Sequence, residues 1–187
     1  MMHKIRHGFI WLMVLMMFQA LSPLSDAAQA KVFVKPYQGK TLSGKAVTFP
    51  RGFEKQLTLL IVAFNPNQQG AINTWLSPLR QLSNTHPEFG FYECPVVDSK
   101  YSSARIAIEA FMKKRLPGKW MYEKTLPLFV DSNAWKQRIA ASDNGKGVYL
   151  FLLNRQGQTV WQGRGGYNPT KLSKLSNYLK NVALSSK

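Results

Sequence analysis

The segment Leu57–Phe64, LTLLIVAF, constrains the fold more than any other part of this sequence. It is a nearly continuous apolar run with the length of one strand, which is typical of a strand buried on both faces in a parallel sheet covered by helices. The polar loop Asn65–Gly70 follows, and Asn65 or Asn67 is suited to cap a helix. A buried strand that leads through a short loop into a helix predicts an α/β fold.

The helix after this loop is predicted by an apolar stripe with helical spacing. The stripe consists of Ile72, Trp75, Leu76, Leu79 and Leu82. Pro78 lies within the stripe, so we expect either a kink or a helix in two pieces.

Strand-like and helix-like segments then alternate to the end of the chain. Further strands are expected at Phe89–Val97, Leu126–Val130, Val148–Leu153 and Thr159–Gly163, the last two joined by a turn. Three more helices are expected: one that starts at Ser102 or Ser103, a short one through Trp135, and a last one from Asn168-Pro169. The inward face of the first of these three is predicted to consist of Ala104, Ala107, Ile108, Phe111 and Met112. Two short strands, Lys31–Val34 and Lys45–Phe49, precede the whole series.

The first thirty residues have the pattern of a secretory signal peptide. Lys4 and Arg6 form a basic start, Gly8–Leu21 is an apolar core, and Ala28-Gln29-Ala30 fits a cleavage site. The apolar core is shorter than the ~20 residues that a transmembrane helix needs. We therefore expect residues 1–30 to be a signal peptide, residues 31–187 to be one domain, and the mature protein to be periplasmic or secreted. The alternative is an uncleaved segment that anchors the domain to the membrane.

The amino-acid composition indicates a folded protein and argues against a metal site. The chain has 45% hydrophobic residues, a net charge of +16, three histidines and one cysteine. The hydrophobic fraction supports a folded core. The histidines and the single cysteine form no ligand cluster, so we expect no metal site and no cofactor.

The order hairpin, β, α, β, α, β, α, β, β, α resembles the thioredoxin superfamily, and within it the secreted thiol-disulfide oxidoreductase and peroxiredoxin branch. The resemblance rests on Leu57–Phe64, on the insert Leu126–Asp131, and on the hairpin Tyr149–Gly163. It implies a central mixed sheet flanked by helices, with an N-terminal β-hairpin and a βα insert.

The chain departs from this family at both halves of the redox site. The family places Cys-x-x-Cys at the start of the first helix, where backbone amides stabilise a thiolate. The equivalent loop here consists of Asn65, Pro66, Asn67, Gln68, Gln69 and Gly70, and it contains no sulfur. The family's cis-proline is replaced by Gly145-Lys146-Gly147. Asparagine and glutamine can form hydrogen bonds but cannot exchange disulfides.

Cys94 is the only thiol of the chain and lies within the strand Phe89–Val97. Free cysteine is among the most buried residue types, so a core position is expected. A reactive thiol or an intermolecular disulfide is the alternative.

Two functions follow from these observations. The first is a redox-inactive thioredoxin-like module that binds a protein partner, as some assembly factors for membrane complexes with this fold do without needing cysteines. The second is an atypical thiol oxidoreductase that uses Cys94 or a relocated site. The positive charge also fits an anionic membrane surface or polysaccharide. Nucleic acid fits the charge, but a secretion signal argues against it.

Overall fold

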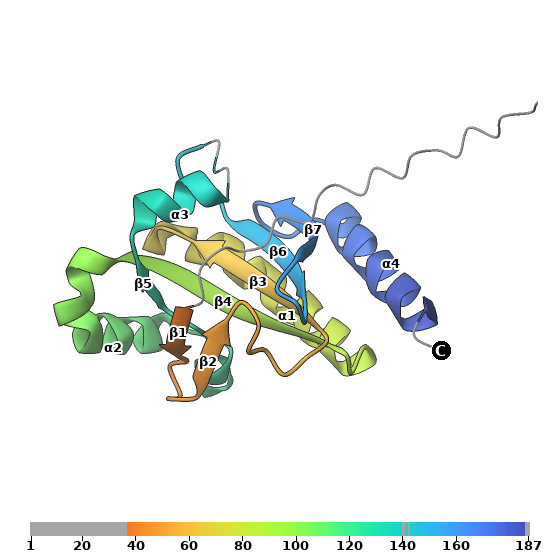
Figure 1. Ribbon diagram of the computed structural model, residues 1–187, viewed down its shortest axis with the longest axis horizontal. Coiled ribbons are helices and arrows are strands. Elements are labelled where there is room, and N and C mark those ends of the chain that lie inside the picture. The colour runs from red at the N-terminus through yellow and green to blue at the C-terminus, as the bar shows by residue number, and fades with distance from the viewer. Residues whose placement is uncertain (1–36, 140, 142, 186–187) are drawn as a thin grey trace, which may run out of the picture.

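A five-stranded mixed sheet forms the centre of the structure (Figure 1), a computed structural model that describes residues 37–139, 141 and 143–185. The expected signal peptide and the expected strand Lys31–Val34 lie outside these residues. Across the sheet the order is β5 (Leu128–Val130), β4 (Phe89–Asp98), β3 (Leu57–Ala63), β6 (Tyr149–Asn154) and β7 (Thr159–Arg164). β3, β4 and β5 run parallel, whereas β6 is antiparallel to β3, and β7 to β6.

The alternation of side chains along the strands gives the sheet two apolar faces. Every residue of β3 is buried, as the continuous apolar run predicts. Leu59 and Ile61 face a core formed with α1 (Gln69–Thr85) and α4 (Pro169–Ser185). Leu60 and Val62 face a second core, which β2 (Ala46–Phe49) and α3 (Ser132–Arg138) help to form.

The expected N-terminal hairpin is present, but with a different first strand. β2 pairs antiparallel with β1 (Tyr37–Lys40). Figure 1 shows this hairpin in front of the sheet and α1 behind it. The Tyr37 hydroxyl accepts a hydrogen bond from the backbone N–H of Phe129 at 3.2 Å and donates one to the carbonyl oxygen of Pro127 at 3.4 Å. One side chain of the hairpin thus reaches the outer edge of β5.

Two expectations about helices need correction. α1 continues through Pro78 as one helix of 17 residues, so the alternative of two pieces is wrong, while the alternative of a kink stays a prediction. Its buried residues are the predicted stripe of Ile72, Trp75, Leu76, Leu79 and Leu82. α2 (Arg105–Arg115) contains no buried residue, so the predicted inward face does not pack as a core. The helix stands off the sheet, and a pocket separates the two.

Short 3₁₀ segments complete the connections: η1 (Pro66–Gln68), η2 (Ser99–Ala104) and η3 (Lys119–Glu123). Within residues 37–139, 141 and 143–185, no helix combines the length and the apolar character that a membrane span requires.

Candidate binding pocket

The loop that follows β3 is a well-capped helix start. Asn65 is extended, and its side-chain oxygen accepts a hydrogen bond from the N–H of Asn67 at 2.9 Å. Pro66 lies in the first helical turn. A backbone N–H at this position has no partner within the helix, so the lack of one in proline costs no hydrogen bond. The prediction that Asn65 or Asn67 caps this region is therefore confirmed for Asn65.

Gln68 fixes this loop to the chain segment that precedes β6. Its Oε1 accepts hydrogen bonds from the N–H groups of Phe64 at 2.7 Å and Asn65 at 3.0 Å. Its Nε2 donates to the carbonyl oxygens of Gly145 at 2.9 Å and Gly147 at 2.8 Å. A primary amide has two donor hydrogens and two acceptor lone pairs, so this side chain is fully paired. At the two places where the family keeps its redox groups, this chain has one buried structural amide.

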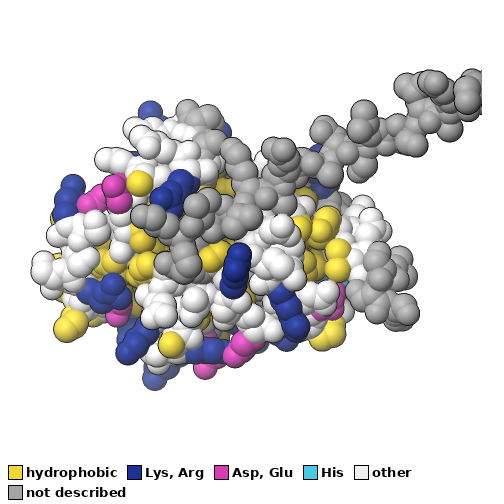
Figure 2. Space-filling model, in the orientation of Figure 1, with side chains coloured by type: hydrophobic (Ala, Val, Ile, Leu, Met, Phe, Trp, Pro, Cys, Tyr) yellow, Lys and Arg dark blue, Asp and Glu magenta, His cyan; other side chains and the backbone are white. Residues whose placement is uncertain are grey.

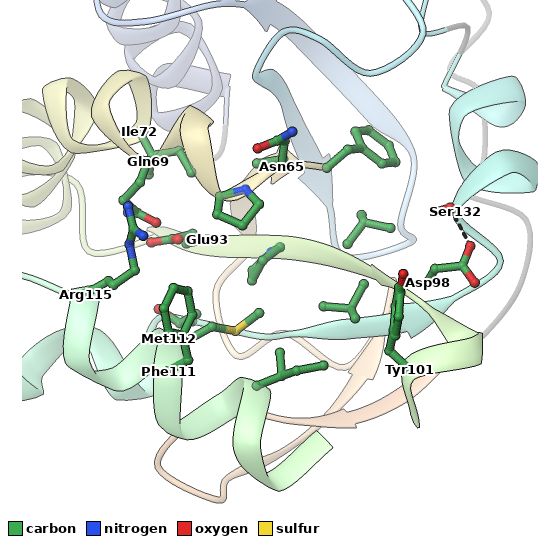
Figure 3. Close-up of a pocket in the computed structure, with 18 of the residues that line it drawn as sticks. Asn65, Gln69, Ile72, Glu93, Asp98, Tyr101, Phe111, Met112, Arg115 and Ser132 are labelled. Atoms are coloured by element: carbon green, nitrogen blue, oxygen red, sulfur yellow. Dashed lines mark hydrogen bonds between the residues drawn. The ribbon is translucent and has the colours of Figure 1, made fainter. Parts of the chain in front are cut away.

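A pocket of about 380 Å³ opens beside this loop, between β4 and α2 (Figure 3). Asn65, Pro66 and Gln69 contribute to its wall, so three of the six expected loop residues lie at one site. Asn67 and Gly70 are exposed and belong to another part of the surface. The remaining walls are mostly apolar and include Ile72, Pro95, Val97, Ile108, Phe111 and Met112.

Two buried polar side chains lie at the floor of the pocket. The exposed fraction is 2% for Glu93 and 1% for Thr125. They are bridge partners on parallel segments, so their side chains lie side by side on the same face. Neither Glu93 Oε2 nor Thr125 Oγ1 has a hydrogen-bond partner among the described residues.

The carboxyl group of Glu93 is strongly perturbed. Burial raises its pKa from 4.5 to about 7, and a hydrogen bond with the Gln69 side chain offsets part of the rise. Figure 3 shows Gln69, Glu93 and Arg115 together at one end of the pocket. At physiological pH this buried group therefore exchanges readily between its neutral and charged forms.

The other end of the pocket is lined by Asp98, Tyr101 and Ser132. Asp98 accepts a hydrogen bond from the Ser132 hydroxyl at 2.6 Å, which is the main reason why the pKa of Asp98 is lowered. Tyr101 lies beside this pair in Figure 3. The pocket is thus an apolar channel along the second half of β4, with a carboxyl group near each end.

The lone thiol is not part of this site. Cys94 is fully buried on the opposite face of β4, among Val62, Val96 and Leu128. Burial raises the pKa of its thiol far above the ordinary value, and the neighbouring Glu93 adds to the rise. The expected core position of Cys94 is confirmed, and a thiolate is disfavoured there.

A second, more polar hollow of about 320 Å³ shares Phe64, Asn65 and Lys136 with the pocket. Asn67, Asn144 and Lys146 also line it. Within the described residues, no group of three or more histidine, cysteine or acidic side chains is placed to hold a metal ion.

Sequence reasoning did not single out Glu93 and Thr125 as site residues. The available signal was an acid within the otherwise apolar strand Phe89–Val97. An ionisable group in such a run must be either paired or functional, because a buried charge is costly. Thr125 gave no signal, since only the fold places it next to Glu93.

No family model matches this chain. No curated protein matches it either. Solved structures do match. A SCO1/SenC family lipoprotein from Bacillus anthracis str. Ames is 12% identical, with 82% of this chain and 96% of that chain covered and a TM-score of 0.54. Yeast Sco1 with copper bound is 16% identical, with 78% and 91% covered and a TM-score of 0.51.

A third match is the exposed lipoprotein thioredoxin Etrx1 from Streptococcus pneumoniae strain TIGR4, at 10% identity, with 79% and 99% covered and a TM-score of 0.51. Identities this low show the fold alone. The chain has the thioredoxin-like fold, with the expected mixed sheet, N-terminal hairpin and insert. With a single cysteine in the whole sequence, it lacks the Cys-x-x-Cys pair.

Proposed function

We propose that this protein is a redox-inactive, extracytoplasmic binding module that docks a protein partner on α2 and the mouth of the pocket. One observation carries the proposal: α2 and the segment before it leave large apolar side chains on the surface. Tyr101, Ile106 and Phe111 are 51%, 86% and 49% exposed. Tyr101 and Phe111 also line the pocket, and exposed apolar side chains beside a pocket are typical of interaction sites.

Redox inactivity is supported by the position of the sulfur and by the loop. Disulfide exchange needs an accessible thiolate, whereas Cys94 is fully buried and its pKa is raised. The loop at the start of α1 offers amides in place of thiols. The alternative of an oxidoreductase that uses Cys94 has no structural observation in its favour.

One matched structure, yeast Sco1, has copper bound, so the residues of this chain can be compared with the ligands that copper needs. Cu(I) prefers thiolate and thioether ligands. The single cysteine of this chain is enclosed in the core, and Met112 supplies the pocket's one sulfur atom. The residues present do not fit such a site, so no copper chemistry is proposed.

Location and charge support the same proposal. The N-terminal sequence has the signal-peptide pattern, and two matched structures are lipoproteins. Lys and Arg side chains are spread over the face in Figure 2 among fewer acidic ones. A dispersed positive charge favours an acidic partner or an anionic surface near the docking site.

Site-specific photo-crosslinking in the native host tests the proposal. A photoreactive residue at Ile106 should cross-link to one partner and give one discrete product, and Phe111→Asp should abolish that product. Tyr167 is the matched control, because it is 38% exposed but does not line the pocket. The proposal fails if position 106 gives no discrete product, or if Tyr167→Asp and Phe111→Asp reduce the yield equally.

A further inference from the structure

The pocket floor contains two hydrogen-bonding atoms that the described protein does not use. Glu93 Oε2 and Thr125 Oγ1 are buried side by side without partners. A buried polar atom without a partner costs about 1–3 kcal/mol, and few such atoms occur in native proteins. An apolar pair at these two positions would avoid that cost, since the neighbouring Phe91 and Leu126 are apolar and fully packed.

The chemistry of the walls limits what can reach these atoms. Pro66, Ile72, Pro95, Ile108 and Met112 all line the pocket, so whatever enters must have an apolar body. The ionised carboxylate of Glu93 only accepts hydrogen bonds, and the Thr125 hydroxyl can also accept. A group that donates hydrogen bonds therefore fits the floor when Glu93 is ionised. Flexible side chains, Met112 and Arg115, border the pocket and can shift to admit such a group.

We infer that the pocket binds a lysine side chain of the protein partner, with Glu93 Oε2 and Thr125 Oγ1 as acceptors for its ammonium group. The inference rests on the docking role proposed above and names the group that anchors it. The four methylene groups of lysine would lie against the apolar walls, and the charge would meet the buried carboxylate.

The geometry favours lysine over arginine. A guanidinium group forms its strongest pair with both oxygens of a carboxylate. Of the two Glu93 carboxyl oxygens, Oε2 is the one that is buried without a partner among the described residues. A compact ammonium group needs separate acceptors rather than a fork, and the adjacent Thr125 hydroxyl supplies the second one.

The binding should depend on pH in a defined direction. A cation prefers the ionised form of Glu93, whose pKa lies at about 7 without ligand. Affinity should therefore rise by about tenfold from pH 6 to pH 8. The other titratable groups on the pocket walls are Asp98, Tyr101, Arg115 and Lys136. The pKa of Asp98 is lowered, whereas that of Glu93 is raised to about 7, so Glu93 is the carboxyl group of the pocket that changes charge in this range.

NMR titration of the whole mature protein tests the inference with three probes: n-pentylammonium, a capped lysine tripeptide, and the same tripeptide with arginine. The first two should shift resonances of pocket residues in a saturable way, and more weakly at pH 6. The arginine peptide should bind less tightly. Glu93→Gln and Thr125→Val should weaken the lysine peptide at least about tenfold and a few-fold respectively. Glu123→Gln, an exposed acid outside the pocket, should change nothing.

Each other result has a definite meaning. If neither amine binds, the inference is overturned, while the cross-link at Ile106 still decides the docking role independently. If n-pentylammonium binds and the lysine peptide does not, the pocket takes a free amine and the lysine assignment is wrong. If Glu93→Gln binds as well as the wild type, the carboxylate is not the anchor.

Discussion

Two helices of this protein, α1 and α2, lie next to the same strand but relate to it in opposite ways. α1 buries five side chains, among them Trp75 and Leu79, with no exposure for either. α2 buries none, and Ile106 on this helix is 86% exposed. The half of β4 under α1 presents Phe89 and Phe91 to a packed core, whereas the half near α2 presents Glu93 and Pro95 to a pocket.

Buried apolar side chains are concentrated on α1, whereas α2 leaves its apolar side chains on the surface or at the pocket. Burial of large apolar side chains dominates folding free energy, so α1 should carry far more of it than α2. A helix that stands off the sheet leaves apolar surface that a partner can cover.

Trp75→Ala should lower the free energy of unfolding by about 3–5 kcal/mol. The indole is fully buried under the sheet, and its Nε1 donates a hydrogen bond to the carbonyl oxygen of Gly165 at 3.0 Å. Urea denaturation followed by circular dichroism measures the loss. Trp120→Ala is the matched control, because Trp120 is 39% exposed and should cost about 1 kcal/mol or less. Equal losses would contradict the contrast.

Glu93→Gln should change how stability depends on pH. The pKa of Glu93 is 4.5 ordinarily and about 7 when buried, so the folded state holds its proton more tightly than the unfolded state. The contribution of this group to the free energy of unfolding is fully present below pH 4.5. It is lost as the pH rises through 7, and the total loss is about 3 kcal/mol.

Urea denaturation at pH 5 and pH 8 measures this effect. The wild type should lose most of that contribution, about 2.5 kcal/mol, between the two pH values, and Glu93→Gln should not. Glu123→Gln, at an exposed position, should keep the wild-type dependence. A wild type with no such loss would mean that Glu93 is solvated, and the pocket floor would then be open.

Gln68→Ala should cost about 2–3 kcal/mol, because it removes four hydrogen bonds and leaves buried backbone groups unpaired. The carbonyl oxygens of Gly145 and Gly147 should become mobile as a result. Hydrogen exchange near Gly145 together with thermal denaturation measures both effects. Asn67→Ala, one residue earlier and exposed, should be close to neutral; a similar cost there would mean that the loop has no special dependence on Gln68.

Ile106→Ala should alter stability by less than about 0.5 kcal/mol, since the side chain buries almost nothing. Leu79→Ala on α1 should cost about 2–5 kcal/mol in the same assay. If both substitutions cost the same, α2 is packed in solution and its apolar surface is not free for a partner.

Much of the fold could be predicted from the sequence because its signals are strong and local. The continuous apolar run of β3 and the spacing of Ile72, Trp75 and Leu79 each predicted one element correctly. The missing cysteine pair was readable directly from the loop after β3.

The site could be predicted only in part. Helical spacing correctly turned Ile108, Phe111 and Met112 toward the protein, and all three line the pocket. The spacing of apolar residues does not determine the distance between a helix and its sheet. An inward, packed face was therefore expected for α2, where the structure has a pocket instead. The role of Gln68 rests on residues more than 70 positions later in the chain, and no local pattern encodes such a contact.

The position of Tyr37 limits how a partner can bind. An exposed edge strand offers unpaired backbone groups to which another chain can add a strand. At the outer edge of β5, the Tyr37 hydroxyl already occupies the N–H of Phe129 and the carbonyl of Pro127. The phenol thus competes with an added strand for these two backbone groups, whether the strand comes from a partner or from a second copy. Two backbone hydrogen bonds fewer are then available for edge-to-edge pairing, which disfavours aggregation through this strand.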